Sequence, residues 1–227
     1  MKKIVLALAF VSSLFVTSCN SDDSNSVSYG ESTGNYWPMA VNNTWVFGSD
    51  IGNSELKIIG STVINGTTYY ELSDQADNVF GIQNWVAKKG ATYLQKTADS
   101  SVNQEGITMN MQGYEIPIFK DDLEANTSWN GNLSSKITYS FNGQTTSTTA
   151  KIKYTGTILE KNSTVVLNGI TYPNVIKTKT IVEMKILEQT VIIDLQYWFA
   201  KDVGPIWENT SYNGTTQERA LINHILY

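Results

Sequence analysis

Alternation of apolar and polar residues with a period of two runs along this chain from residue 36 to its end, and turn dipeptides interrupt it. Asn-Gly occurs at residues 65–66, 142–143 and 168–169. Each pair is the preferred sequence of a two-residue type I′ hairpin, because both central residues of that turn need positive φ. The pattern therefore predicts an all-β fold made of antiparallel hairpins.

The flanks of these turns predict a register, because a slip by one residue would move every side chain to the other face of the sheet. About residues 142–143 and 168–169 we expect three cross-strand pairs: Ile137 with Thr148, Leu133 with Ile152, and Val165 with Tyr172. These pairs bring mainly apolar side chains onto one face.

The segment 175–200 is too long for one ordinary strand, and a turn at Glu188-Gln189 would fold it into a hairpin. That turn pairs Ile186 with Val191, Met184 with Ile193, Val182 with Leu195, Thr180 with Tyr197, and Thr178 with Phe199. The opposite, polar face receives Lys177, Lys179, Glu183, Lys185, Asp194, Gln196 and Trp198. In this register Glu183 and Asp194 lie directly opposite each other.

These hairpins predict one antiparallel meander that forms a strongly curved sheet, as a half-barrel or an open barrel. Helix should be minimal, at most a turn or two around residues 120–125. We expect a single domain over 36–227, because no linker divides it. Asn43-Thr44-Trp45 and Asn126-Thr127-Ser128-Trp129 begin two similar series of motifs. A meander duplicated over 36–100 and 120–227 explains this similarity, and so does shared hairpin chemistry.

The first residues carry an export signal. Lys2 and Lys3 precede an apolar run over 4–16 that is about 20 Å long as a helix, too short for the roughly 30 Å core of a bilayer. Val16-Thr17-Ser18-Cys19 then resembles the bacterial lipobox. The resemblance implies a signal peptide over 1–18, cleaved before Cys19, and a lipidated flexible tether over 19–35. The alternative is an ordinary secreted protein with a cysteine at this position by chance.

Lipidation at Cys19 would attach the protein to the cell outer membrane through palmitate-type acyl chains, two or three of which anchor firmly. Asp22-Asp23 resembles the acidic surface-export signal of lipoproteins from the Bacteroidetes. A solubilising linker explains these aspartates equally well. Exposure at the cell surface therefore stays an expectation.

Further motifs resemble uncharacterised surface lipoproteins of the Bacteroidetes. They are Tyr36-Trp37-Pro38-Met39 with Asn42-Asn43-Thr44-Trp45, the Asn-Gly-x-Thr-Tyr segment that ends in Pro173-Asn174-Val175, and Tyr197-Trp198-Phe199-Ala200-Lys201-Asp202-Val203-Gly204. The resemblance implies an all-β protein attached to the outer membrane and supplies no catalytic residues. The family opening usually has Gly at Asn42 or Asn43, and Asn can replace Gly at positive φ.

Composition excludes several functions. The formal net charge is −5 and Arg219 is the single arginine, so there is no basic footprint for nucleic acid. One His and one Cys exclude multi-histidine metal sites and an internal disulfide. No phosphate-binding loop, nucleophile elbow or HExxH motif occurs. We therefore predict no catalytic residues, no metal and no cofactor.

Trp85 and Trp198 are the candidate ligand-binding residues, the latter with Gln196 and Asp194 beside it on the polar face. An indole flanked by amide and carboxylate groups suits a glycan or an envelope protein partner. The alternative is that a second layer covers Trp198.

Three functions stay open. The first is non-catalytic binding or display at the cell envelope. The second is a carrier of a lipid or other apolar ligand in a half-barrel cavity, lined by core-face residues such as Met184, Ile193, Leu195, Tyr197 and Phe199. The third and least favoured is a glycosidase that uses Glu183 and Asp194.

Overall fold

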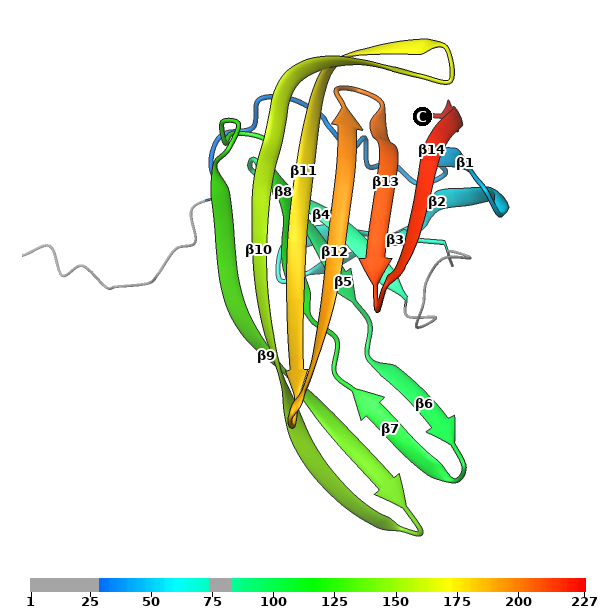
Figure 1. The fold of residues 1–227 in the computed structure, drawn as a ribbon, viewed down its shortest axis with the longest axis vertical. Helices are drawn as coiled ribbons and strands as arrows, with labels where there is room; N and C mark the ends of the chain where they lie inside the picture. Colours follow the sequence, from blue (N-terminus) through cyan, green and yellow to red (C-terminus); the bar gives the residue numbers. More distant parts are fainter. Residues whose placement is uncertain (1–28, 74–82) are drawn as a thin grey trace, which may run out of the picture.

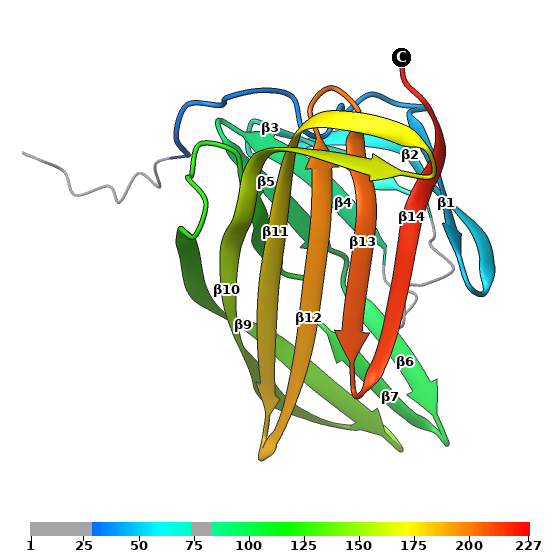
Figure 2. The same cartoon turned by 45° about the horizontal axis from the view of Figure 1, so that its top comes forward.

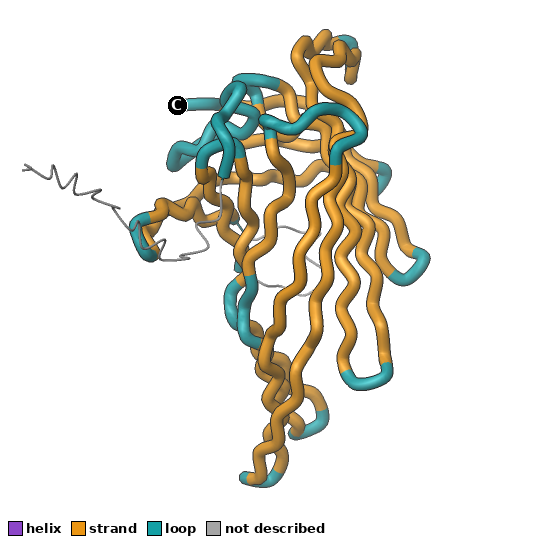
Figure 3. Tube along the Cα trace, turned by 90° about the vertical axis from the view of Figure 1, so that its left-hand side faces the viewer, coloured by secondary structure: helices purple, strands orange, loops and turns teal. Residues whose placement is uncertain are grey.

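The computed structural model describes residues 29–73 and 83–227. Over these residues the chain forms strands, turns and loops and no helix (Figure 3), so none that is long and apolar enough to cross a bilayer. The predicted signal peptide and Cys19 lie outside the described residues. The turn or two of helix expected around residues 120–125 is wrong. Two consecutive turns replace it, because Asn126 takes φ 64° and its N–H donates to Ile158 O (2.7 Å).

Fourteen antiparallel strands make up the described part of the chain (Figure 1). In chain order they are β1 (Thr44–Ser49), β2 (Gly52–Ile64), β3 (Thr67–Leu72), β4 (Asn84–Lys89), β5 (Thr92–Thr97), β6 (Ser100–Gln104), β7 (Ile107–Met111), β8 (Glu115–Lys120), β9 (Ser128–Phe141), β10 (Gln144–Leu167), β11 (Ile170–Ile186), β12 (Gln189–Ala200), β13 (Gly204–Tyr212) and β14 (Thr215–Ile225).

The strands form one strongly curved, open sheet in the order β6-β7-β9-β10-β11-β12-β13-β14-β1-β2-β3-β4-β5-β8. The last strand, β14, pairs with β1, so the two ends of the fold meet in the middle of the sheet. The sheet curls until β8, at one end, faces β9–β11. Trp129 Nε1 donates to Pro117 O (3.2 Å) and Thr180 Oγ1 donates to Ile118 O (3.3 Å) across this contact. The predicted all-β, strongly curved open sheet is confirmed.

Asn-Gly turns connect the β2–β3, β9–β10 and β10–β11 hairpins as predicted. Asn65, Asn142 and Asn168 take φ values of 49°, 48° and 50°, and the glycine after each is also in the positive-φ region. A further Asn-Gly turn at residues 213–214 joins β13 to β14 with the same geometry. The sequence carries the same signal there, and our reading of it missed that turn.

The registers about residues 142–143 and 168–169 are those predicted, with Ile137 opposite Thr148 and Val165 opposite Tyr172. The β11–β12 register differs by two residues. Ile186 lies opposite Gln189, and the turn is Leu187-Glu188 instead of Glu188-Gln189. A shift by two preserves the faces, so the predicted apolar and polar sets of this hairpin are correct although the pairs are wrong.

An aromatic core fills the space enclosed by the curved sheet. Phe119 stacks on Tyr93 (ring centroids 4.1 Å apart) and on Phe199 (4.3 Å). Trp37, from the segment before β1, meets Trp45 edge-on at 6.4 Å. Aromatic side chains bury the largest apolar area per residue, so these rings dominate the stability of the fold.

The long β10–β11 hairpin bends over one end of the sheet and its tip reaches β14 (Figure 2). Its register shifts repeatedly between Ile158 and Val165, as bulges require. Asn168 at the tip donates from Nδ2 to Leu221 O (2.9 Å), and Tyr172 next to it is buried. The bend therefore closes this end of the sheet.

Residues 29–35, assigned from sequence to the flexible tether, are fixed to the body. Asp121 is fully buried and accepts hydrogen bonds from Ser32 Oγ (2.7 Å) and Thr33 N (2.8 Å). Asn35 O accepts from Asp202 N (2.6 Å). Small polar side chains are typical of a flexible linker, so composition alone suggested flexibility. In the fold, Ser32 and Thr33 instead donate hydrogen bonds to a buried carboxylate.

Candidate ligand-binding cavity

Residues of β12, β13 and β14 line a cavity of about 600 Å³, together with residues of β4, β5 and the β1–β2 turn. On β12 and β13 the lining residues alternate, because every second residue of a strand faces the concave side, whereas β14 contributes Thr215 to Arg219 in succession. Ile193, Leu195 and Tyr197 come from β12, and Thr210 and Tyr212 come from β13. The volume is within the range of small-molecule sites.

A buried ion pair forms part of this lining. Glu208 and Arg219 lie opposite each other on β13 and β14 and are 8% and 7% exposed. The guanidinium reaches one carboxylate oxygen twice, from Nη2 at 2.6 Å and from Nε at 2.8 Å. Its other contacts include Ser54 Oγ (3.1 Å) and the ring of Phe47, 4.6 Å from the centroid. The two charges neutralise each other, whereas Asp50 and Glu218 give the rest of the lining an acidic character.

Tyr197 lies opposite Glu208 on the neighbouring strand. Removal from water raises the pKa of the Tyr197 phenol well above its usual range, the Glu208 charge adds to this effect, and Arg219 opposes it. The phenol therefore stays protonated at physiological pH and can offer an O–H donor.

The cavity has two kinds of wall. Ile193 and Leu195 on β12 supply apolar surface, whereas Asn84 on β4 and Gln95 on β5 supply side-chain amides. Thr210 adds a hydroxyl. This arrangement fits an amphipathic molecule, because apolar surface can pack on one wall while hydroxyl or amide groups meet the other.

Sequence reasoning found this site in part. Of the five residues predicted to line a carrier cavity, Ile193, Leu195 and Tyr197 do so. Phe199 is instead fully buried in the aromatic core, and Met184 packs beside that core. Sequence reasoning missed the ion pair. The sequence contained one indication of it: Arg219, the single arginine of the chain, lies two residues before the apolar Leu221, so both point to the same, buried face of the strand.

Trp198 lies on the outer face of the sheet, as its polar neighbours predicted. Its ring stacks on Trp207 of β13, with centroids 4.6 Å apart, and Lys177 Nζ lies 4.5 Å from its centroid. Trp207 Nε1 in turn donates to Glu218 Oε1 (2.9 Å). Trp198 is only half-buried, so part of its surface stays open to a ligand.

The predicted pair of Glu183 and Asp194 does not form. Glu183 lies opposite Ile192, and Asp194 lies opposite Ile181. Asp194 instead pairs with Lys179, whose Nζ is 2.7 Å from Oδ2, and accepts a long hydrogen bond from Gln196 Nε2 (3.4 Å). The two-residue shift in register causes this difference. Within residues 29–73 and 83–227, no three His, Cys, Asp or Glu side chains come together as a potential metal site.

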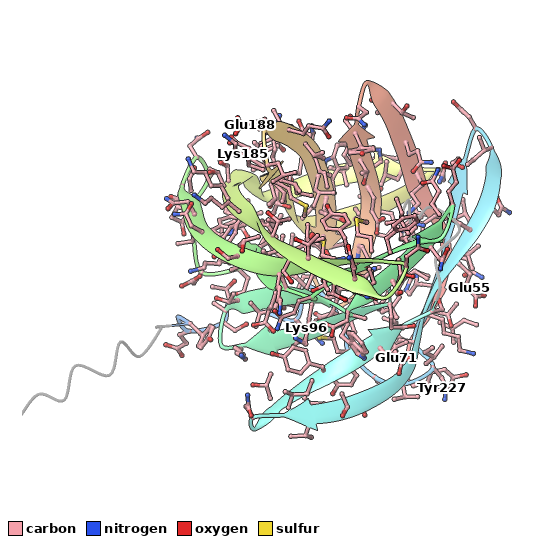
Figure 4. All side chains as sticks on the ribbon, turned by 90° about the horizontal axis from the view of Figure 1, so that it is seen from below. Glu55, Glu71, Lys96, Lys185, Glu188 and Tyr227 are labelled. Carbon is pink, nitrogen blue, oxygen red and sulfur yellow. The ribbon has the colours of Figure 1, made fainter. Side chains whose placement is uncertain are left out.

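Trp85 belongs to another part of the surface. It packs beside a small cluster of Tyr69, Ala87 and Leu94 on the outer side of β3–β5. Its direct cross-strand neighbours are Glu71 and Lys96, which Figure 4 shows on the opposite side of the molecule from the β11–β12 turn. The fold therefore does not join Trp85 to Trp198, Gln196 and Asp194 in one site.

Comparisons with known proteins give few relatives. No family model matches the chain, and no curated protein matches it in sequence. The chain is similar in structure to a presumptive lipoprotein from Parabacteroides distasonis, with 10% identity, a TM-score of 0.48, and coverage of 86% of this chain and 100% of the other. It is also similar to a presumptive exported protein with a YmcC-like fold from Bacteroides fragilis, with 10% identity, a TM-score of 0.39, and coverage of 83% and 98%. Both TM-scores are low, so neither structure says what this chain does.

Proposed function

We propose that this protein is a non-catalytic, lipid-anchored binding protein of the bacterial cell envelope that holds a small amphipathic molecule in the cavity between β12–β14 and β4–β5. The observation that carries the proposal is a cavity of about 600 Å³ with an apolar wall on β12 and the neutralised Glu208–Arg219 pair in its lining. A carrier of this kind needs space and shape, and it needs no reactive group.

The anchor is proposed from the sequence. The apolar run over 4–16 and the lipobox-like residues 16–19 favour acylation at Cys19 and attachment to the outer membrane. The membrane would then be one partner of the protein, reached through the lipid. Display at the cell surface is the further expectation from Asp22-Asp23.

A binding role without catalysis agrees with the contacts of Glu208, the buried carboxylate among the three that line the cavity. Glu208 is in contact with both Nε and Nη2 of Arg219, so its charge is engaged in this ion pair. Asp194, the other carboxylate considered for acid–base chemistry, is held by Lys179 on the outer face.

The first test is native mass spectrometry of the acylated protein extracted gently from its own membrane. A stoichiometric adduct beyond the mass of the Cys19 acyl chains is expected. Thr210→Trp should remove the adduct by filling the cavity. Asn209→Trp is the matched control, because Asn209 is the next residue of β13 and pairs with Gln196 on the outer face. The proposal fails if the adduct is absent from the wild type or survives in Thr210→Trp.

A glycan on the outer face is the competing ligand, favoured by the half-open surface of Trp198 beside Trp207. Trp198→Ala should leave a ligand of the cavity untouched and should abolish glycan binding. If Trp198→Ala loses the adduct and Thr210→Trp keeps it, the ligand binds on the outer face and not in the cavity.

A further inference from the structure

The cavity between β12–β14 and β4–β5 contains two polar atoms that have no hydrogen-bond partner in the part of the chain that the structure describes. The first is Tyr197 Oη. In that part of the chain, the unpaired side-chain atoms that are sealed from solvent are Trp37 Nε1 and Asp122 Oδ1. Tyr197 Oη is therefore unpaired but accessible, and it opens onto the cavity that Tyr197 lines.

Glu208 supplies the second atom. Both contacts from Arg219, from Nε at 2.8 Å and from Nη2 at 2.6 Å, go to Oε2 of this carboxylate. Oε1 accepts no hydrogen bond from the described residues, and it is not sealed from solvent either. Since each oxygen of a carboxylate can accept, Oε1 keeps its acceptor capacity for a ligand.

These two atoms belong to the same place in the cavity. Tyr197 and Glu208 are direct partners on β12 and β13, and the side chains of such a pair start about 5 Å apart on one face of the sheet. Burial, and after it the negative charge of Glu208, raises the pKa of Tyr197, so the carboxylate lies within electrostatic reach of the phenol. The phenol stays protonated, and a donor therefore stands beside an acceptor.

The surroundings of this pair carry little net charge. Glu208 and Arg219 are the charged groups that act on the Tyr197 phenol, and they neutralise each other. The other two carboxylates of the lining are engaged elsewhere: Asp50 lies in the exposed β1–β2 turn, and Glu218 accepts from an indole on the outer face. A ligand group that meets the pair therefore gains little from a charge of its own.

An apolar wall continues from this pair along β12. Leu195 and Ile193 follow Tyr197 at every second position on the same face, and the three residues span about 13 Å of strand. Tyr197 forms the inner end of this row, because its ring stacks on Phe199 of the aromatic core at 5.6 Å. A methylene chain can thus lie along Leu195 and Ile193 with its polar end at Tyr197.

Given the proposed function, on which this assignment rests, we infer that the cavity holds a neutral amphiphile with a hydroxyl or carboxamide group at its polar end. That group accepts a hydrogen bond from Tyr197 Oη and donates one to Glu208 Oε1. Hydroxyl and carboxamide groups can do both, whereas a carboxylate cannot donate and an ammonium cannot accept. The cavity therefore selects its ligand by paired hydrogen bonds and not by charge.

Four probes with the same eight-carbon chain test this class. Calorimetric titration of the full acylated protein in phosphatidylcholine nanodiscs, corrected with empty nanodiscs, measures the binding of octanol, octanamide, octanoate and octylammonium. Octanol and octanamide should bind about tenfold more tightly than the two ions, the usual effect of one hydrogen bond made or lost.

Tyr197→Phe removes the donor and breaks no hydrogen bond among the described residues, so the variant should fold. It should weaken octanol and octanamide about tenfold and leave octylammonium, which offers no acceptor, unchanged. Tyr172→Phe is the matched control, because Tyr172 is buried outside the cavity lining, and it should bind all four probes like the wild type.

Equal affinities for octanol and the two ions overturn the inference, as does a preference that Tyr197→Phe leaves intact. Tightest binding of octylammonium overturns it in favour of a cationic ligand, and absence of saturable binding of every probe overturns it outright. The native adduct and its removal by Thr210→Trp decide the proposed function separately. An adduct that Thr210→Trp removes, without a preference among the probes, keeps the cavity as the binding site and discards only the class of ligand.

Discussion

At the scale of single residues, the Glu208–Arg219 pair is the most consequential interaction in the concave interior. Both groups are at least nine-tenths buried, so folding strips most of their water and each depends on the other for compensation. Replacing both with apolar residues is often neutral, whereas removing one leaves a buried charge unpaired. The pair therefore affects stability asymmetrically, and this asymmetry can be measured.

Arg219→Met should lower the free energy of unfolding by about 3–5 kcal/mol, and the double variant Glu208→Leu/Arg219→Met should recover most of that loss. Urea denaturation followed by circular dichroism measures both. Lys185→Met is the control: its ion pair with Glu188 is 3.8 Å long and exposed, and should contribute less than about 1 kcal/mol (Figure 4). A double variant as unstable as Arg219→Met would show that the loss reflects packing and not the unpaired charge.

At the scale of elements, the β11–β12 hairpin shows how a register is chosen. Its turn places Leu187 at φ 54° with its side chain largely exposed. A positive φ costs a residue with a Cβ roughly 1–2 kcal/mol, so local turn chemistry argues against this dipeptide. This strain is tolerated because β10 pairs with β11 and β13 pairs with β12, and these pairings fix the register of both strands of the hairpin.

Leu187→Asn should raise the free energy of unfolding by about 1 kcal/mol, because asparagine tolerates the left-handed region and leucine does not. Thermal denaturation of the variant against the wild type measures this change. Ile192→Asn on β12 is the matched control: its side chain is also largely exposed, yet its backbone φ is not positive, so no gain is expected there. A gain of equal size in both variants would attribute the effect to lost surface hydrophobicity.

Prediction from sequence succeeded in this fold where local chemistry decides and failed where distant strands decide. Asn142 and Asn168 each precede glycine in a type I′ turn, so the pairs about them follow from the turn alone. Leu187 carries no such signal, and its turn is set by neighbouring strands. The full cavity lining could not be predicted, because an alternation pattern does not show that β4 and β5 face β12–β14.

At the scale of the whole molecule, the same pattern of backbone hydrogen bonds occurs just before β1 and just before β9, the first strands of the two similar series of motifs. Asn42 N donates to Ile58 O (2.8 Å), and Ile58 N returns a bond to the residue after Asn42. In the same way, Asn126 N donates to Ile158 O (2.7 Å), and Ile158 N donates to the carbonyl of Thr127, the residue after Asn126 (3.0 Å). The register of the following strand pair shifts just after Ile58 and just after Ile158. These shared features favour the duplication that the sequence motifs suggested.

A duplication of this kind predicts equal responses to matched substitutions in the two halves. Asn42 and Asn126 take φ values of 77° and 64°, and both side chains are exposed, so substitution there changes backbone strain and little else. Asn42→Gly and Asn126→Gly should be nearly neutral, because glycine adopts this conformation freely. Asn42→Ala and Asn126→Ala should each cost about 1 kcal/mol, and the double alanine variant should show the sum, since the two sites share no hydrogen-bond partner. Urea denaturation measures all five variants. Alanine costs that differ several-fold between the two sites would mean that the shared hydrogen bonds arose from hairpin chemistry alone, without a common architecture behind them.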